Sequence, residues 1–144
     1  MKTIGDVMTH GVAKLQTIDP ASTVKQAVDL LNQHNIGALP VCDAGGSLVG
    51  IITERDVLRL CGSDGIAGLG THMVSEVMTP SPLVGVPDDS VAYVMRIMTE
   101  HRIRHLPVMD GGRLVGITSI GDVVKAQLEE TNAEVSYLRE YVGG

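Results

Sequence analysis

Apolar residues recur at helical spacing in two stretches of the chain, near residues 24–31 and 91–98. Within each stretch they stand three or four positions apart, which places them on one face of an amphipathic helix. Ser22 and Ser90 precede the two patterns and are suitable N-cap residues. The pattern predicts two equivalent helices, with apolar faces formed by Val24, Ala27, Val28 and Leu31, and by Val91, Val94, Met95 and Met98.

Paired short apolar runs predict two β-hairpins. The runs flank the turn sequences DAGGS and DGGR, and they cover residues 39–42 with 48–52, and residues 106–109 with 114–118. Glycine after aspartate between apolar runs is a strong hairpin signal, because glycine accepts the positive φ that tight turns require.

Further elements frame each hairpin in the same order. A β-prone piece at 16–18 or 83–86 leads through a proline to the amphipathic helix. A second helix follows each hairpin, from Glu54 to about Cys61 and from about Ile120 onward. The predicted order is β-α-β-β-α, and it occurs twice.

The duplication is also visible in the letters of the sequence. IGDVMT returns as VSEVMT, STVKQAVDLL as DSVAYVMRIM, IGALPVCD as IRHLPVMD, and LVGIITERDVL as LVGITSIGDVV. The difference in residue number between equivalent positions of the two copies falls along the chain, from 70 (78 − 8) to 67 (107 − 40) to 66 (122 − 56). The length changes therefore lie between the matched blocks. We expect a first repeat at 1–62, a glycine-rich linker at 63–73, a second repeat at 74–128, and a C-terminal helix extension at 129–144.

The segment between the repeats is predicted to be a loop. Residues 62–72 contain four glycines in eleven positions. A phosphate-binding P-loop is the alternative, but no Lys-Ser/Thr pair follows these glycines, as that motif requires.

The C-terminal segment carries a separate apolar pattern. Its residues are spaced 4, 3, 4, 3 and 4 positions apart, which is the pattern of a coiled-coil seam. They are Val124, Leu128, Thr131, Val135, Leu138 and Val142. Such a stripe must be buried, either on the same protomer or in a dimer. We favour a homodimer.

Composition and charge narrow the classes of function. The chain has no Phe or Trp and only three Tyr, so it lacks the aromatic platforms that bind single-stranded nucleic acid. Its net charge of −6 gives no general attraction to nucleic acid or to anionic membranes. No apolar run approaches the roughly 18 residues that span a bilayer, and no signal peptide is evident at the N-terminus. We expect a cytoplasmic protein in which Cys42 and Cys61 are free thiols.

The two repeats share a hydroxyl residue followed three positions later by aspartate. These residues are Thr53 and Asp56 in the first repeat, and Ser119 and Asp122 in the second. Their spacing is that of a helix capping box, although Glu or Gln is the usual partner and aspartate is short for that reach. Spacing alone therefore favours a cap for Thr53 and Ser119, which a phosphate-binding role does not exclude.

A metal site is not expected. His101 and His105 are four residues apart, but they should not share one helix, because residues 103–108 turn into a strand. No cysteine or carboxylate nearby completes a set of ligands.

The doubled LPV strand, the Gly-Gly hairpins and the pair GIITERD and GITSIGD resemble the tandem CBS domain, or Bateman module. The resemblance covers about residues 1–128 and is closest to small stand-alone bacterial CBS signal-transduction proteins. It implies a mixed α/β (α+β) fold of two β-α-β-β-α units about a pseudo-twofold axis. It also implies clefts for adenosine-containing ligands such as AMP, ATP or NAD.

The resemblance further implies a role for each signature residue. Asp56 and Asp122 would bind ribose hydroxyls, and Thr53 and Ser119 would help to hold phosphate. The complete set of expected nucleotide-binding residues is Thr17, Gly37, Ala38, Leu39, Pro40, Thr53, Arg55, Asp56, Val84, Arg104, His105, Leu106, Pro107, Ser119 and Asp122.

The two repeats differ in their cations. Arg55 aligns with Gly121, whereas Arg104 and His105 align with Gly37 and Ala38. A charge-assisted contact to phosphate contributes about 1.5–3 kcal/mol, so the two sites should differ in their preference for phosphate. A solvated strand start is the alternative for Arg104 and His105, while the small residues of the first repeat leave room for a purine.

We therefore expect a regulatory sensor that binds an adenine nucleotide and signals in trans to an unknown protein partner. It would need no cofactor, and it would not be an enzyme, because no nucleophile–base pair is evident. The alternatives are a dimeric structural adaptor without a ligand, and an enzyme that processes nucleotides.

Overall fold

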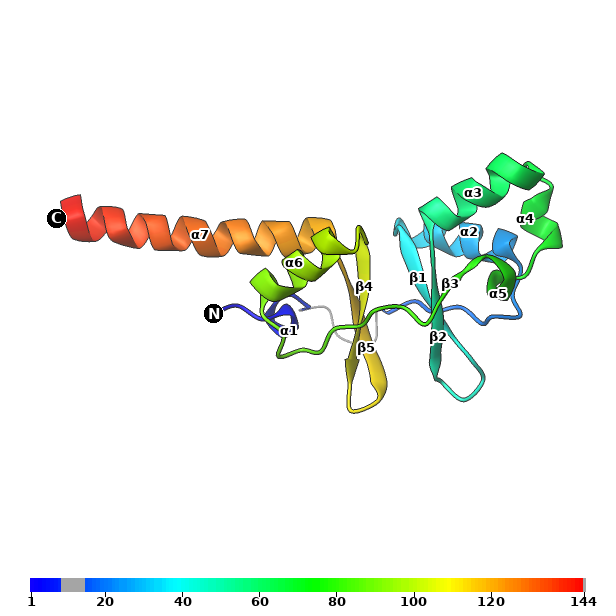
Figure 1. Cartoon of the computed structure of the whole chain (residues 1–144), viewed down its shortest axis with the longest axis horizontal. Helices are drawn as coiled ribbons and strands as arrows, with labels where there is room; N and C mark the ends of the chain where they lie inside the picture. Colours follow the sequence, from blue (N-terminus) through cyan, green and yellow to red (C-terminus); the bar gives the residue numbers. More distant parts are fainter. Residues whose placement is uncertain (9–14, 144) are drawn as a thin grey trace. The chain divides into compact units, whose positions relative to one another are not determined.

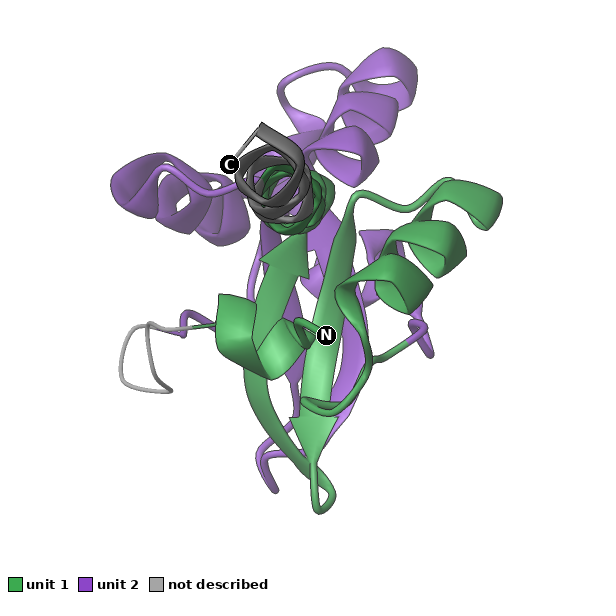
Figure 2. Ribbon diagram, turned by 90° about the vertical axis from the view of Figure 1, so that its left-hand side faces the viewer, with its two compact units in different colours: residues 1–13, 84–144 green, residues 14–83 purple. Residues whose placement is uncertain are grey.

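The computed structural model describes residues 1–8 and 15–143, with side chains as far as residue 132. The chain divides into two compact units (Figure 2): unit 1 comprises residues 1–13 and 84–144, and unit 2 comprises residues 14–83. Each unit combines helices with a small antiparallel sheet (Figure 1), which confirms the predicted mixed class.

Unit 2 contains the hairpin of the first repeat. Strand β1 (Ala38–Cys42) pairs with β2 (Leu48–Thr53), and the short strand β3 (Thr79–Pro80) pairs with the other edge of β2. Ile18 forms a parallel bridge to β1, through the bonds Ile18 N–H to Pro40 O (3.1 Å) and Cys42 N–H to Ile18 O (3.0 Å). The β-prone piece at 16–18 is thus reduced to a single bridge residue.

Four helices complete unit 2: α2 (Val24–His34), α3 (Glu54–Asp64), α4 (Gly68–Thr71) and α5 (Val74–Val77). The N-cap of α2 is Thr23 and not Ser22, because the hydroxyl of Thr23 accepts the Gln26 N–H and the side chain of Gln26 accepts the Thr23 N–H. This reciprocal pair forms a complete capping box, which a cap at Ser22 would lack.

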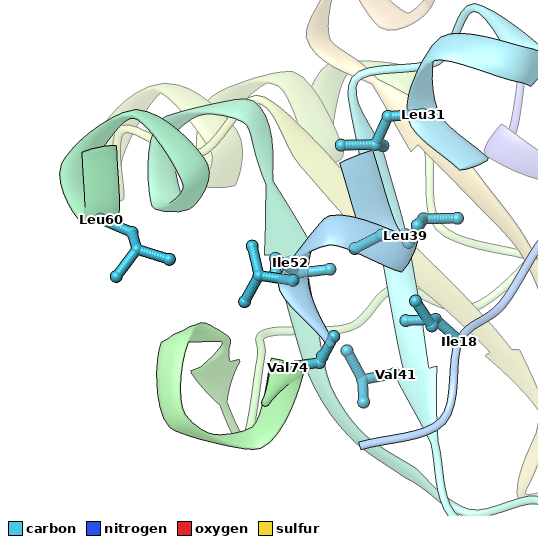
Figure 3. Close-up of a cluster of buried hydrophobic side chains, with 9 residues drawn as sticks. Ile18, Leu31, Leu39, Val41, Ile52, Leu60 and Val74 are labelled. Atoms are coloured by element: carbon cyan, nitrogen blue, oxygen red, sulfur yellow. The ribbon is translucent and has the colours of Figure 1, made fainter. Parts of the chain in front are cut away.

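An aliphatic core joins these helices to one face of the sheet (Figure 3). Val24, Ala27 and Leu31 of α2 are buried, as their spacing predicts. Burial of the Val24 and Leu31 side chains contributes about 1.5–3 kcal/mol each. The core of unit 2 consists of Ile18, Val24, Ala27, Leu31, Leu39, Val41, Ile52, Leu60 and Val74.

The glycine-rich segment 62–72 is mostly helical and is not a loop. Helix α3 extends to Asp64 and ends at Gly65, whose φ of +70° a side chain would strain. The short helix α4 follows, and it buries Gly68, where an added Cβ would lie 2.8 Å from the Cβ of Asp64. The loop prediction was wrong because two of the four glycines serve a helix end and a close helix contact.

Unit 1 contains most of the second repeat, which forms the same order of elements: a helix, an antiparallel hairpin and a second helix. It contains α6 (Val91–Glu100), a hairpin of β4 (His105–Asp110) and β5 (Arg113–Ser119), and the 24-residue helix α7 (Ile120–Gly143). Ser90 caps α6 as predicted, since its hydroxyl accepts the Tyr93 N–H. The core of unit 1 consists of Ile4, Val91, Val94, Met98, Leu106, Val108, Val123 and Ala126.

The leading segments of the two repeats are exchanged: each packs in the compact unit that contains the rest of the other repeat. Helix α1 (Ile4–Val7) packs with the second repeat, where Ile4 N–H donates to Asp89 O at 2.9 Å. Helix α5 packs with the first repeat, where Val74 N–H donates to Ser22 O at 2.8 Å. We call residues 2–8 and 72–78 the exchanged segments. Because of this exchange, the compact units do not follow the expected linear boundaries of 1–62 and 74–128.

A methionine of each exchanged segment covers a glycine of the neighbouring strand. An added Cβ would lie 2.5 Å from Met78 Sδ at Gly50, and 2.6 Å from Met8 Sδ at Gly116. A side chain cannot replace hydrogen at either position unless the neighbouring atoms move. The glycine of each LVGI sequence thus provides the space for a thioether.

Candidate functional site

Three segments of unit 2 that the sequence singled out meet at one end of β1. Ala38 pairs with Thr53 across the hairpin, and Glu54 N–H donates to Gly37 O at 3.0 Å. The carbonyl of Pro40 accepts the N–H of Ile18, which brings Thr17 to the same strand. We call Thr17, residues 37–40 and residues 53–56 the Asp56 half-site.

Asp56 is held at the start of α3 by several hydrogen bonds. Its Oδ2 accepts the Thr53 N–H at 2.9 Å, and its own N–H donates to Thr53 Oγ1 at 3.3 Å. The capping box is therefore complete, and the expectation that aspartate would be too short is wrong, because the Asp56 carboxylate reaches the Thr53 N–H. Asp56 is only 7% exposed.

Thr79 is a contact of Asp56 that the sequence did not indicate. Its hydroxyl donates to Asp56 Oδ1 at 3.4 Å, from strand β3 on the far side of β2. Residue 79 ends the block VSEVMT, which repeats IGDVMT, so the repetition marked the residue but not its contact. The corresponding Thr9 lies outside the described residues.

Unit 1 reproduces the same backbone frame around Asp122. His105 pairs with Ser119, and Ile120 N–H donates to Arg104 O at 2.8 Å. Gly85 N–H donates to Pro107 O at 2.9 Å, which places Val84 beside β4. We call Val84, residues 104–107 and residues 119–122 the Asp122 half-site.

The carboxylate of the Asp122 half-site differs from Asp56. The Asp122 N–H donates to Ser119 Oγ at 3.1 Å, so Ser119 caps α7. Within the described part of the chain, however, the Asp122 carboxylate accepts no hydrogen bond, and the residue is exposed. Ser119 and Asp122 thus form half of a capping box.

The remaining predicted residues divide by exposure. Leu39 and Leu106 lie in the cores of their units, so only their backbone could contact a ligand. Ala38, Pro40 and Pro107 are also buried, and Gly37 and His105 are half-buried. The side chains of Thr17, Arg55, Val84 and Arg104 are exposed and accessible to a ligand.

The charges of the two half-sites differ. In the Asp56 half-site, Arg55 stands between two carboxylates, Glu54 and Asp56, in the first turn of α3. In the Asp122 half-site, Arg104 replaces a glycine on the strand side and Asp122 is the acidic residue of the first turn of α7. With one cation and one carboxylate, against one cation and two carboxylates, the Asp122 half-site is the less acidic of the two.

Other chemical groups do not enlarge either half-site. His101 caps the end of α6 and His105 begins β4, which confirms that the two histidines do not share a helix. Among the described side chains, those of residues 1–8 and 15–132, no group of three or more His, Cys, Asp or Glu is arranged to hold a metal ion. Cys42 and Cys61 are free thiols, and partial burial raises the pKa of Cys42. None of the described helices has the length and apolar character needed to cross a membrane.

Comparison with known proteins identifies the repeat unit. The family model for the CBS domain matches twice, at residues 4–63 and 74–129. The CBS domain-containing protein YhcV of Bacillus subtilis is 37% identical over 133 residues, which cover 92% of this chain and 91% of that protein. The mitochondrial CBS domain-containing protein CBSX3 of Arabidopsis thaliana is 42% identical over 126 residues, or 85% of this chain but only 61% of CBSX3.

Solved structures share the fold. The CBS-domain protein ATU1752 of Agrobacterium tumefaciens aligns with a TM-score of 0.80 at 38% identity, covering 88% of this chain and 99% of that one. CBSX2 of Arabidopsis thaliana, solved in complex with AMP, gives 0.77 at 34% identity and covers 91% and 99%. The CBS pair of MJ0100, solved with 5′-methylthioadenosine and S-adenosylmethionine, gives 0.79 at 26% identity and covers 90% and 98%. The chain therefore belongs to the CBS-domain proteins, and its two repeats form a tandem CBS pair.

Proposed function

We propose that this protein is a regulatory module that binds an adenosine-containing ligand of the AMP, ATP or NAD type. Its action would be in trans, by altering the binding of a separate protein. One observation carries the proposal: in both units, a hydroxyl–aspartate pair starts a helix directly beside the backbone of an apolar strand.

The chemistry of a helix start suits such a ligand. Free N–H groups and the positive end of the helix dipole favour phosphate near Thr53 and Ser119. A carboxylate at the edge of that site can accept two hydrogen bonds from a ribose diol. The exposed Asp122 can do so directly, whereas Asp56 would first give up its contact with Thr79.

The strand side of each half-site suits a purine. Gly37 and Ala38 present backbone with little side chain, and Val84 is 46% exposed beside the corresponding strand of unit 1. The relatives solved with AMP, or with 5′-methylthioadenosine and S-adenosylmethionine, support adenosine as the shared ligand element.

We propose that the two half-sites differ in their ligands. Arg104 adds a cation to the Asp122 half-site, while Arg55 is flanked by Glu54 and Asp56. The Asp122 half-site should therefore hold the more highly phosphorylated ligand, with Arg55 serving a single phosphate in the other.

Calorimetry and native mass spectrometry with AMP, ATP, NAD and S-adenosylmethionine test the proposal. We expect saturable binding, lost in part in Asp56→Ala and in part in Asp122→Ala, and unchanged in the control Asp88→Ala, which removes an exposed aspartate outside both half-sites. Absence of binding by every one of these compounds would refute the proposal. Conversion of a nucleotide to product would instead favour an enzyme.

A dimeric adaptor is the second candidate, because one face of α7 is uncovered within unit 1. Val123 and Ala126 are buried against the unit, but Val124 is 39% exposed and Leu128 is 57% exposed. Thr131 is exposed on the same predicted seam, whereas Val135, Leu138 and Val142 lie outside the described side chains. We propose that this seam pairs with a second copy of the chain.

Sedimentation analysis of Leu128→Asn tests the dimer. We expect a lower mass than for the wild type, because a polar residue weakens an apolar seam. The control Leu58→Asn replaces another exposed leucine, located on α3 and 72% exposed, and should leave the mass unchanged. A dimer that survives Leu128→Asn would exclude this seam as the interface.

A further inference from the structure

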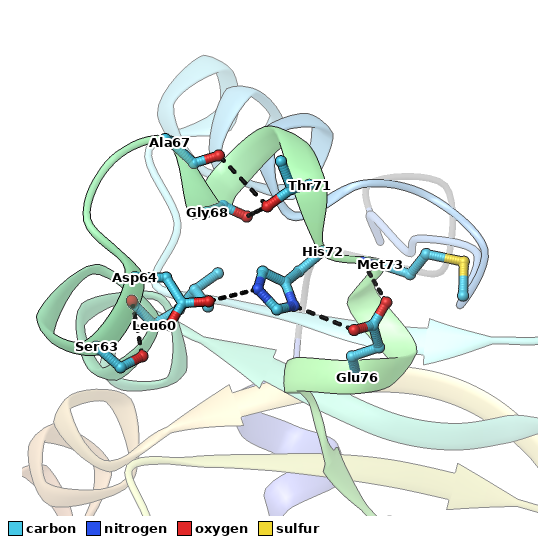
Figure 4. Close-up of polar contacts among 9 residues, drawn as sticks. All are labelled: Leu60, Ser63, Asp64, Ala67, Gly68, Thr71, His72, Met73 and Glu76. Atoms are coloured by element: carbon cyan, nitrogen blue, oxygen red, sulfur yellow. Dashed lines mark hydrogen bonds and ion pairs between the residues drawn. The ribbon is translucent and has the colours of Figure 1, made fainter.

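A histidine in unit 2 links two helices through two carboxylates (Figure 4). The Nε2 atom of His72 lies 2.6 Å from Asp64 Oδ2, at the end of α3, and Nδ1 lies 3.1 Å from Glu76 Oε2, in α5. His72 begins the exchanged segment 72–78. The ring therefore ties this segment to α3.

Both of these contacts require the charged form of the ring. A neutral imidazole has one N–H donor, so it can donate to only one carboxylate, whereas the imidazolium donates to both. The hydrogen bond to Asp64, followed by that to Glu76, raises the pKa of His72. The same ring lowers the pKa of Asp64, and the Met73 N–H together with the ring lowers the pKa of Glu76.

The other groups around His72 do not titrate near neutral pH. From α4, Gly68 O accepts the His72 N–H at 3.2 Å, and the Thr71 hydroxyl donates to the carbonyls of Ala67 and Gly68 (Figure 4). From α2, the Val24 N–H donates to His72 O at 3.0 Å. Among the described residues, Asp64 and Glu76 are the charged groups that act on the ring.

The exchanged segment connects this histidine to the Asp56 half-site. Met78, at its end, covers Gly50, and the next residue, Thr79, donates its hydroxyl to Asp56. The position of Thr79 therefore depends on how firmly the segment is held. His72 secures one end of the segment, and β3 follows the other.

Unit 1 has the same tether built from a different cation. Lys2 is the residue equivalent to His72, since its carbonyl accepts the Val91 N–H at 3.0 Å just as that of His72 accepts the Val24 N–H. Lys2 Nζ lies 3.2 Å from Glu129 Oε2 on α7, as His72 lies beside Asp64 on α3. A lysine ammonium keeps its charge through the neutral range, whereas a histidine does not.

We infer that His72 is a pH-sensitive tether: its protonated ring holds the exchanged segment 72–78 on unit 2, and its deprotonation loosens the segment and releases Asp56 from Thr79. A folded-state pKa above the unfolded value means that the stabilisation is present at low pH and lost as the pH rises through the folded value. At acid pH the tether weakens again, as Asp64 and Glu76 become protonated. The exchanged segment 2–8 should keep its tether as the pH rises through neutrality, because Lys2 stays charged there.

Hydrogen exchange provides the direct test, with unit 1 as an internal control. Between pH 6 and pH 8.5, we expect the protection factors of the Val74 and Met78 amides to fall several-fold. Those of the equivalent Ile4 and Met8 amides should stay constant. Equal behaviour of the two exchanged segments would overturn the inference.

Two variants separate charge from packing. His72→Lys keeps a cation as in Lys2 and should abolish the pH dependence, while His72→Gln should lower protection at pH 6. If His72→Gln fails to fold, the comparison of the wild type with His72→Lys still tests whether the pH dependence of protection requires the histidine. A pH dependence that persists in His72→Lys would contradict the tether.

The consequence for Asp56 rests on the proposed function, so its test is separate. AMP binding is measured in the Asp122→Ala background, which leaves the Asp56 half-site. The quantity compared is the ratio of the AMP affinity at pH 8.5 to that at pH 6. We expect this ratio to be several-fold larger in Asp122→Ala than in the double variant Asp122→Ala/His72→Lys. Equal ratios would overturn the link to Asp56. Absence of AMP binding at both pH values would refute the proposed function there and leave the tether to be judged by hydrogen exchange.

Discussion

Unit 1 and unit 2 share one backbone frame but treat the aspartate at the helix start differently. Equivalent hydrogen bonds recur with almost equal lengths, such as Glu54 N–H to Gly37 O at 3.0 Å and Ile120 N–H to Arg104 O at 2.8 Å. Even the irregularity near the end of the first hairpin strand occurs at equivalent positions. Yet Asp56 is buried and bonded, whereas Asp122 is exposed.

This difference indicates that the duplicated frame and the duplicated site are separable. The frame depends on main-chain bonds and aliphatic packing, which many side chains satisfy. The site depends on a few residues at the solvent edge, and these have diverged between the units. Matched substitutions in the two units can therefore measure how far each has become specialised.

The largest expected difference concerns the two glycines beneath the methionines. At Gly50, an added Cβ would meet Thr79 O at 2.9 Å as well as Met78 Sδ, whereas at Gly116 the close atoms belong to the flexible Met8 side chain. We expect Gly50→Ala to lower the free energy of unfolding by about 2–3 kcal/mol, and Gly116→Ala by about 1 kcal/mol or less. Urea unfolding measures the two losses in free energy. Equal losses would contradict the prediction, because they would mean that the backbone of β3 shifts as easily as the Met8 side chain.

The next difference concerns the two aspartates in the absence of ligand. Asp56→Ala removes the acceptor of the Thr53 N–H from a buried position, and should cost about 1–2 kcal/mol of unfolding free energy. Asp122→Ala removes an exposed side chain that accepts no bond among the described residues, and should cost about 0.5 kcal/mol or less. Thermal unfolding of the ligand-free variants compares them, and a reversed order would contradict the assigned bonding.

The smallest expected effect is a gain in stability. Thr118 is 1% exposed and its hydroxyl has no partner among the described residues, while the equivalent residue of unit 2 is Ile52, which is fully buried. Thr118→Val should raise the free energy of unfolding by about 1 kcal/mol, because an unsatisfied buried hydroxyl is removed. The control Thr99→Val replaces an exposed residue of α6 whose hydroxyl donates to Met95 O at 2.7 Å, and it should not raise the free energy of unfolding. A loss of stability in Thr118→Val would indicate that its hydroxyl has a polar partner.

Local signals in the sequence predicted most of the fold. Helical spacing, the Gly-Gly turns and the repeat identified α2, α6 and both hairpins, since each depends on residues close in the chain. The N-cap of α2 could also have been found, because Gln26 stands three residues after Thr23 and completes a capping box. Ser22 and Thr23 both offer a hydroxyl, and the partner decides between them.

Contacts between distant residues were not predictable in this way. A repeat does not reveal on which copy its leading segment packs, so the exchange of residues 2–8 and 72–78 had no local signal. Thr79 reaches Asp56 only because β3 pairs with β2, a register set by the fold. The resemblance supplied the residues of the half-sites, and the structure supplied the burial and the bonds that distinguish them.

The exchange of segments also sets an order for folding during synthesis. Residues 18–80 contain the core and the sheet of unit 2, so this unit can fold as soon as that stretch has left the ribosome. Unit 1 joins Lys2 to Glu129, 127 positions away, and its core needs Ile4 together with Val123 and Ala126. Such distant contacts form slowly, because a long loop must close before they contribute. Ile4 is thus translated long before its core partners Val123 and Ala126, and it can reach its native contacts only after they have been made.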